Sequence, residues 1–154
     1  MRSRGRAGPA ELGSDPLKTR VRGADALPMA RILVIDDDPF VRSMVERALR
    51  TFGHRVRVVD DGEKGLEVLA QCRVDLVVTD ILMPGKEGIE TIVDIRSWHG
   101  EVPILAISGG GATSAPEAPL EDARLIGANA TLAKPFDVPT LIGAVDRLLR
   151  SVAA

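Results

Sequence analysis

The stretch RILVIDDDPF, residues 31–40, decides the fold of this 154-residue chain. Its apolar, partly β-branched beginning is typical of a buried parallel strand, and it ends abruptly in three aspartates. Asp38 followed by Pro39 indicates a helix start, because aspartate caps free backbone N–H groups and proline fits the first helical position. Apolar residues then recur at helical spacing as far as Gly53, which ends the predicted helix.

The same alternation continues along the rest of the chain. The predicted strands cover residues 32–35, 55–59, 75–80, 103–107 and 130–133. Apolar residues at helical spacing mark further helices at Leu66–Ala70, Ile89–Val93, Leu120–Ile126 and Leu141–Val152. In one of these helices, Ile89, Ile92 and Val93 are expected to share the inward face. Five strand–helix units predict an α/β fold, a doubly wound five-stranded parallel sheet with helices on both faces.

Composition and charge exclude several classes of protein. With 45% hydrophobic and 27% charged residues, the chain is neither strongly disordered nor membrane-embedded. A net charge of −2 and 3% aromatic residues give no indication of binding to nucleic acid or an anionic membrane. A single cysteine, Cys72, excludes an internal disulfide. We therefore expect a cytoplasmic protein.

The first residues differ from the remainder in charge. Residues 1–28 carry six basic and three acidic side chains, a net charge of +3, which leaves −5 for the remainder. They lack helical or strand periodicity and the apolar core of a signal peptide. We expect residues 1–29 to be a disordered basic tail and residues 30–154 to form one domain. Met29 stands close before the first apolar run, so a mis-assigned start is an alternative explanation of the tail.

Chemically active side chains stand at the ends of four of the five predicted strands. Asp36 and Asp37 follow the first strand, Asp80 ends the third, Ser108 follows the fourth and Lys134 follows the fifth. Because the carboxyl ends of parallel strands meet at one edge of a sheet, we expect these side chains to lie close together. Strand ends otherwise need only turn-forming residues, so the combination indicates a binding site.

The residue types at this edge favour phosphoryl chemistry. Carboxylates held close together repel one another and need a proton or a cation. Because the available ligands are oxygens, with no nearby histidine or cysteine, Mg²⁺ fits best. Lys134 suits a phosphate oxygen, Ser108 offers a hydroxyl donor, and an aspartate beside them can accept a phosphoryl group. Neither G-x-G-x-x-G nor G-x-x-x-x-G-K-[ST] follows the first strand, which argues against a dinucleotide enzyme or a P-loop NTPase.

Four stretches of the chain together resemble the receiver domain of bacterial response regulators. They are residues 32–39, residues 75–80 with Met83-Pro84-Gly85 and Gly88, residues 106–109, and Gly127-Ala128 through Lys134-Pro135-Phe136. The resemblance covers nearly all of residues 31–152. It implies a flavodoxin-like (βα)5 fold with strand order 2-1-3-4-5 and a cis peptide bond between Lys134 and Pro135.

The resemblance also implies a role for each acidic residue. Asp80 would accept a phosphoryl group from a phosphohistidine on a sensor histidine kinase or a histidine phosphotransfer protein. Asp37, Asp80 and the Leu82 carbonyl would bind Mg²⁺, and Asp36 would orient a metal-bound water.

The other implied roles concern signalling. Ser108 and Lys134 would contact the phosphoryl oxygens and report phosphorylation. We expect a stand-alone response regulator rather than an enzyme, acting through an unidentified downstream protein or a phosphorelay, without nucleic acid or membrane partners.

The chain departs from the usual family pattern at three places. Thr131 stands where many members carry an aromatic residue, and the segment 108–111 is glycine-rich. Leu82 stands where a polar side chain often places the hydrolytic water. We therefore expect slow self-dephosphorylation.

Two alternatives remain open from the residues alone. A haloacid-dehalogenase-type phosphatase would use Asp36 as its nucleophile, since Asp36-x-Asp38, Ser108 and Lys134 follow the order of that family. Phe40 stands where that motif requires Thr or Val, which weighs against it. The second alternative is a receiver that binds partners without phosphorylation.

Overall fold

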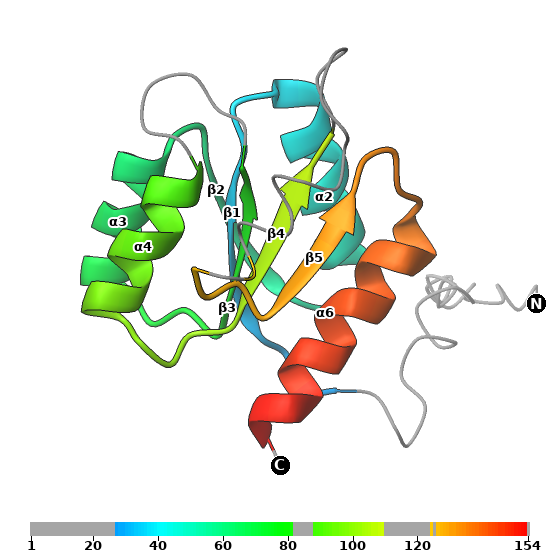
Figure 1. The fold of residues 1–154 in the computed structure, drawn as a ribbon. Helices are drawn as coiled ribbons and strands as arrows, with labels where there is room; N and C mark the ends of the chain where they lie inside the picture. Colours follow the sequence, from blue (N-terminus) through cyan, green and yellow to red (C-terminus); the bar gives the residue numbers. More distant parts are fainter. Residues whose placement is uncertain (1–26, 82–87, 110–123, 125, 154) are drawn as a thin grey trace, which may run out of the picture.

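The structure is a computed structural model that describes residues 27–81, 88–109, 124 and 126–153 (Figure 1). The strands are β1 (Arg31–Ile35), β2 (Arg55–Val59), β3 (Leu76–Asp80), β4 (Ile104–Ser108) and β5 (Ala130–Ala133). The helices are α2 (Pro39–Thr51), α3 (Gly62–Gln71), α4 (Gly88–Trp98) and α6 (Val138–Ala153). Residues 1–26 of the expected tail (residues 1–29) and most of the expected helix at 120–126 lie outside the described residues.

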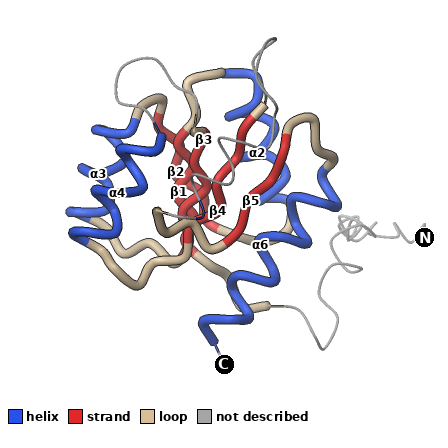
Figure 2. Tube along the Cα trace, in the orientation of Figure 1, coloured by secondary structure: helices blue, strands red, loops and turns tan. Residues whose placement is uncertain are grey.

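The sheet has the predicted architecture. All neighbouring strands are parallel, in the order β2-β1-β3-β4-β5. Helices α2 and α6 cover one face and α3 and α4 the other (Figures 1 and 2). The direction in which the chain adds strands reverses at β1. Strand β2 lies on one side of β1, and β3, β4 and β5 follow on the other side. The carboxyl ends of β1 and β3 therefore form a topological switch point, where ligands bind in open α/β sheets.

The core lies on both faces of the central strands. Every residue of β3 and β4 is buried, as is β1 after Arg31. This explains why these strands read as continuous apolar runs instead of alternating. On one face Val34 and Leu105 belong to the same cluster as Leu141 of α6, and on the other Leu33 belongs to the same cluster as Ile92 of α4.

The sequence signals for α2 are confirmed. The Asp38 carboxylate accepts hydrogen bonds from the backbone N–H groups of Phe40, at 2.9 Å, and Val41, at 3.4 Å. Gly53 follows the helix with a φ of +91°, a conformation that glycine adopts without steric cost. The cap fixes where the chain turns from β1 into α2, directly beside Asp36 and Asp37.

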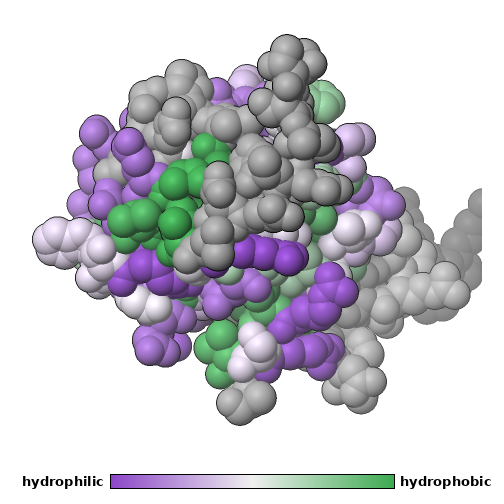
Figure 3. Space-filling view, viewed as in Figure 1, coloured by the Kyte–Doolittle hydropathy of each residue, from purple (hydrophilic) through white to green (hydrophobic). Residues whose placement is uncertain are grey.

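One prediction about α4 is wrong. Val93 does not face inward: it is 45% exposed, whereas Thr91, Ile92 and Ile95 are buried. Positions separated by three or four residues share one side of a helix, so the buried stripe starts from Gly88 and excludes Val93. Figure 3 shows hydrophobic residues gathered on the surface over α4.

The remaining differences are small. Strand β3 begins one residue later than predicted, and β4 is shifted by one residue so that Ser108 is its last residue. Within the described part of the chain, no helix has the length and apolar character needed to cross a membrane.

Candidate functional site

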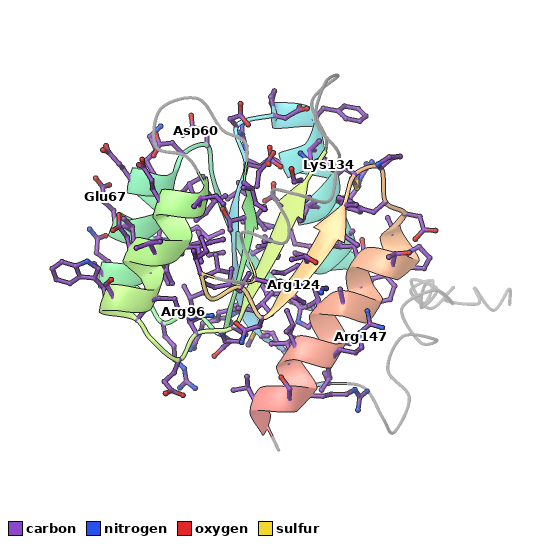
Figure 4. All side chains as sticks on the ribbon, viewed as in Figure 1. Asp60, Glu67, Arg96, Arg124, Lys134 and Arg147 are labelled. Atoms are coloured by element: carbon purple, nitrogen blue, oxygen red, sulfur yellow. The ribbon has the colours of Figure 1, made fainter. Side chains whose placement is uncertain are left out.

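The five predicted polar residues converge at the carboxyl edge of the sheet. Asp36 and Asp37 follow β1, Asp80 ends β3, Ser108 ends β4, and Lys134 follows β5. Figure 4 shows Lys134 at this end of the sheet, near the carboxyl ends of the strands. Asp36 is 3%, Asp80 5% and Ser108 0% exposed, so these polar groups are nearly removed from water.

The three carboxylates form a compact cluster. One oxygen from each of Asp36, Asp37 and Asp80 lies within 4.8 Å of the others. Oxygen ligands from carboxylates at this spacing fit a hard divalent cation such as Mg²⁺. The Leu82 carbonyl, the fourth expected ligand, lies outside the described residues.

Lys134 supplies the positive charge of the site. Its Nζ lies 2.8 Å from Asp80 Oδ2 and 3.5 Å from Asp36 Oδ2. Burial lowers the pKa of Lys134, but the hydrogen bond and charge of Asp80, with a smaller effect of Asp36, outweigh burial and raise the pKa overall. Lys134 is therefore a fully charged ammonium shared unequally between two carboxylates.

One lysine does not neutralise the cluster, and Asp36 shows the consequence. Burial raises the pKa of Asp36, and the charge of Asp80 raises it further. The backbone N–H of Asp38, 2.9 Å from Asp36 Oδ1, and the ammonium of Lys134 compensate only in part. The site thus carries an excess of negative charge that a bound cation would relieve.

Ser108 holds an unused hydrogen-bonding group. Among the described residues its buried Oγ has no hydrogen-bond partner. Such groups are rare in folded proteins, so each one requires an explanation. Its carbonyl accepts a 2.9 Å hydrogen bond from the backbone N–H of Lys134, which ties the ends of β4 and β5 together. The hydroxyl is therefore held at the sheet edge with its donor free for an incoming group.

Two supporting residues were given no role from the sequence. Arg42 donates a hydrogen bond from Nη1 to the Asp36 carbonyl, at 2.8 Å, and so fixes the turn after β1. A Cβ at Gly88 would overlap the carbonyl oxygen of Asp80 and lie 2.5 Å from the Cα of Ile81. Gly88 was among the residues on which the resemblance rests, but it was assigned no role. The sequence around Arg42 gives no sign of its contact with Asp36, because that contact depends on the direction in which α2 leaves the sheet.

This fold and this site together define a class. The sheet is doubly wound, and three carboxylates lie at its switch point. A lysine follows the last strand, and a buried serine ends the strand between. This is the arrangement of a receiver-type α/β domain. The Lys134–Pro135 peptide bond is cis, as that class implied.

Comparison with known proteins establishes the family. The family model described as the response regulator receiver domain matches residues 32–146, and the chain belongs to this family. The haloacid-dehalogenase alternative, with Asp36 as nucleophile, is therefore left without support.

The curated relatives are longer than the matched region. The chain is 37% identical over 120 residues to the response regulator MprA of Mycolicibacterium vanbaalenii, a match that covers 78% of this chain and 50% of the relative. It thus spans about half the length of the curated relatives it matches.

Solved structures agree with the fold. The chemotaxis response regulator CheY4 of Vibrio cholerae is 30% identical with a TM-score of 0.70, over 79% of this chain and 99% of that one. The receiver domain of NtrX from Brucella abortus is 30% identical with a TM-score of 0.72, over 77% and 98%.

Proposed function

We propose that the chain is a phosphoacceptor, rather than a turnover enzyme, and that it receives a phosphoryl group on Asp80 from a phosphohistidine of a partner protein. The observation that carries the proposal is the position of the Asp80 carboxylate. It lies 2.8 Å from an ammonium and within 4.8 Å of two further carboxylates that fit a cation. Carboxylates are established covalent nucleophiles, and phosphoryl transfer depends chiefly on positioning and charge neutralisation.

Each neighbour has a separate part in this reaction. Asp36, Asp37 and Asp80 would hold Mg²⁺, which would offset the negative charge of the incoming phosphoryl group. Lys134 would pair with a phosphoryl oxygen, and the free Ser108 hydroxyl would donate a hydrogen bond to another. The N–P bond of the phosphohistidine breaks as the bond from Asp80 to phosphorus forms, and the imidazole leaves.

An exposed apolar surface beside the site suits the phosphate donor. Phe40 is 80% exposed in the first turn of α2, directly after the aspartates, and Phe52 and Val138 are also exposed. With Met44 and Ala48 they line a hollow of about 390 Å³. Large exposed apolar side chains gathered in one place mark protein–protein contacts. We propose that a histidine kinase or a histidine phosphotransfer protein docks here, so that its phosphohistidine reaches Asp80.

The output is proposed to run through protein contacts. CheY4, to which this chain is similar over 99% of the CheY4 length, is a chemotaxis response regulator, whereas MprA is twice as long as the matched region. We propose that this chain acts as a stand-alone receiver that signals to a partner protein or passes the phosphoryl group along a relay. Size-exclusion chromatography of the phosphorylated chain with candidate partners tests this.

The acceptor is tested by intact mass after incubation with Mg²⁺ and acetyl phosphate. The wild type should gain one phosphoryl group, and Asp80→Asn should gain none. Asp38→Asn is the matched control, because Asn also caps helices and Asp38 lies outside the carboxylate cluster. No gain in the wild type, or a gain that persists in Asp80→Asn, would contradict the assignment.

A further inference from the structure

A basic groove lies at the opposite end of the sheet from the carboxylate site. It has a volume of about 490 Å³ and is lined by Arg31, Arg55, Arg57 and Arg73 together with Val68 and Cys72. Arg31 and Arg55 are the first residues of β1 and β2, whereas the carboxylates stand at the other ends of the strands. We refer to this region as the arginine groove. A molecule bound there would leave the candidate phosphorylation site accessible.

The charge of the arginine groove opposes that of the remaining domain. Residues 29–154 carry a net charge of −5, yet four of their arginines line this groove and no acidic residue lines it in the described part of the chain. Arg73 approaches Asp75 at 3.5 Å. No described carboxylate lies within ion-pair distance of the other three arginines, all of which are exposed.

The arginines are also placed where they repel one another. Arg31 and Arg55 are direct neighbours in the register of β1 and β2, and Arg57 follows two residues along the same strand. Like charges side by side on adjacent strands destabilise a sheet. An anion bound between them would relieve this repulsion.

Protection of the sheet edge accounts for only part of the cluster. Charged residues on an edge strand prevent unwanted pairing with other chains, and β2 is an edge strand. Arg31, however, lies on β1, which is paired on both sides, and Arg73 lies in the connection before β3. The convergence of all four on one groove therefore needs a further explanation.

We propose that the arginine groove docks an acidic, extended segment of a partner protein. Arg55 and Arg57 are two residues apart on a strand, about 6.6 Å, which equals the spacing of alternate side chains in an extended peptide. A single phosphate has only four oxygens, too few for a separate bidentate pair with each of four guanidinium groups, whereas several carboxylates on one chain could supply such pairs. Val68 of α3 supplies an apolar contact beside the charges.

The probe for this proposal is a fluorescein-labelled octaglutamate peptide, and the readout is fluorescence anisotropy against full-length protein. The peptide should bind, and binding should weaken steeply with salt, because exposed charge pairs are screened. The double variant Arg55→Gln/Arg57→Gln should bind about tenfold more weakly, or worse. The control Arg147→Gln/Arg150→Gln removes the same charge from exposed positions of α6, and Figure 4 shows Arg147 far from β2. The affinity of this control for the peptide should stay within about twofold of that of the wild type.

Cys72 reports whether the peptide occupies the groove itself. It is the single cysteine of the chain, it is half-buried, and its Sγ accepts a hydrogen bond from Arg57 Nη1 at 3.4 Å. Saturating octaglutamate should slow alkylation of Cys72 by neutral iodoacetamide several-fold. Unslowed alkylation, or equal loss of binding in both double variants, would overturn the proposal. Tighter binding of a short DNA duplex through Arg55 and Arg57 would also overturn it and assign the groove to nucleic acid.

Discussion

Gly88→Ala should both destabilise the domain and disturb the phosphoacceptor. An added Cβ would overlap the Asp80 carbonyl oxygen and lie 2.5 Å from the Cα of Ile81. Both contacts are with backbone that the central strand holds in place. To restore even the 3.0 Å limit, α4 must move away by 0.5 Å for the Cα of Ile81 and by more for the Asp80 carbonyl oxygen. A close-packed interior resists such a displacement.

The magnitude follows from two contributions. Overpacking of this kind costs typically about 1–3 kcal/mol. The displacement also weakens the 3.0 Å hydrogen bond from the Gly88 N–H to the Ile81 carbonyl, worth about 1 kcal/mol. We expect Gly88→Ala to lower the free energy of unfolding by about 3 kcal/mol, measured by urea denaturation. In the folded fraction, phosphorylation by acetyl phosphate should slow, because the added Cβ presses on the Asp80 carbonyl oxygen and α4 shifts relative to the end of β3.

Gly143→Ala is the matched control. Gly143 lies within α6, and an added Cβ there meets no atom within 4 Å. Alanine should therefore raise the free energy of unfolding by about 0.5–1 kcal/mol, since glycine disfavours helix interiors. If Gly88→Ala unfolds within about 0.5 kcal/mol of the wild type, the close approach of α4 to β3 does not limit the fold and the reasoning fails.

Three further predictions concern charge and docking. Burial and the charge of Asp80 raise the pKa of Asp36, so its ionised form opposes folding. Asp36→Asn should therefore be more stable than the wild type at neutral pH without Mg²⁺. The difference between their urea midpoints should shrink as the pH falls towards 3.8, because the wild-type carboxyl becomes protonated. Burial lowers the pKa of His54, so as the pH falls below 6.5 the histidine is protonated in the unfolded chain before it is protonated in the folded one. The free energy of unfolding of the wild type should therefore fall in this pH range, and that of His54→Asn should not fall in this way. Phe40→Ala should slow phosphotransfer from a cognate histidine kinase about tenfold while leaving labelling by acetyl phosphate unchanged; equal slowing with both donors would contradict the docking role.

The sequence was sufficient for the fold wherever local signals agreed. Strands β2 and β5 have the predicted bounds, and α2 starts at the residue that the Asp38-Pro39 pair indicates. These features depend on residues within one or two turns of each other. The strand order came from the resemblance, because the alternation of strands and helices does not by itself specify it.

Contacts between distant segments could not be predicted in the same way. His54 is buried, and its Nδ1 accepts a hydrogen bond from the Ala30 N–H at 3.2 Å. Arg96 donates hydrogen bonds to the carbonyls of Gly127 and Val102 and to the Asn129 side chain, and so ties α4 to the segment before β5. Nothing near these residues in sequence marks such partners, since they meet only when the helices pack against the sheet.

The charge distribution of the site indicates where a phosphorylation signal should leave it. Asp36 and Asp37 follow β1 and Asp80 ends β3, whereas Lys134 follows β5, an edge strand. A phosphoryl group on Asp80 would extend its negative charge away from the β3 backbone, and Lys134 should follow it. Because the Lys134 N–H is bonded to the Ser108 carbonyl, the ends of β4 and β5 should move together. We therefore expect amide chemical shifts to change most along β5 and the adjoining start of α6 after phosphorylation, and unchanged shifts there would refute this route.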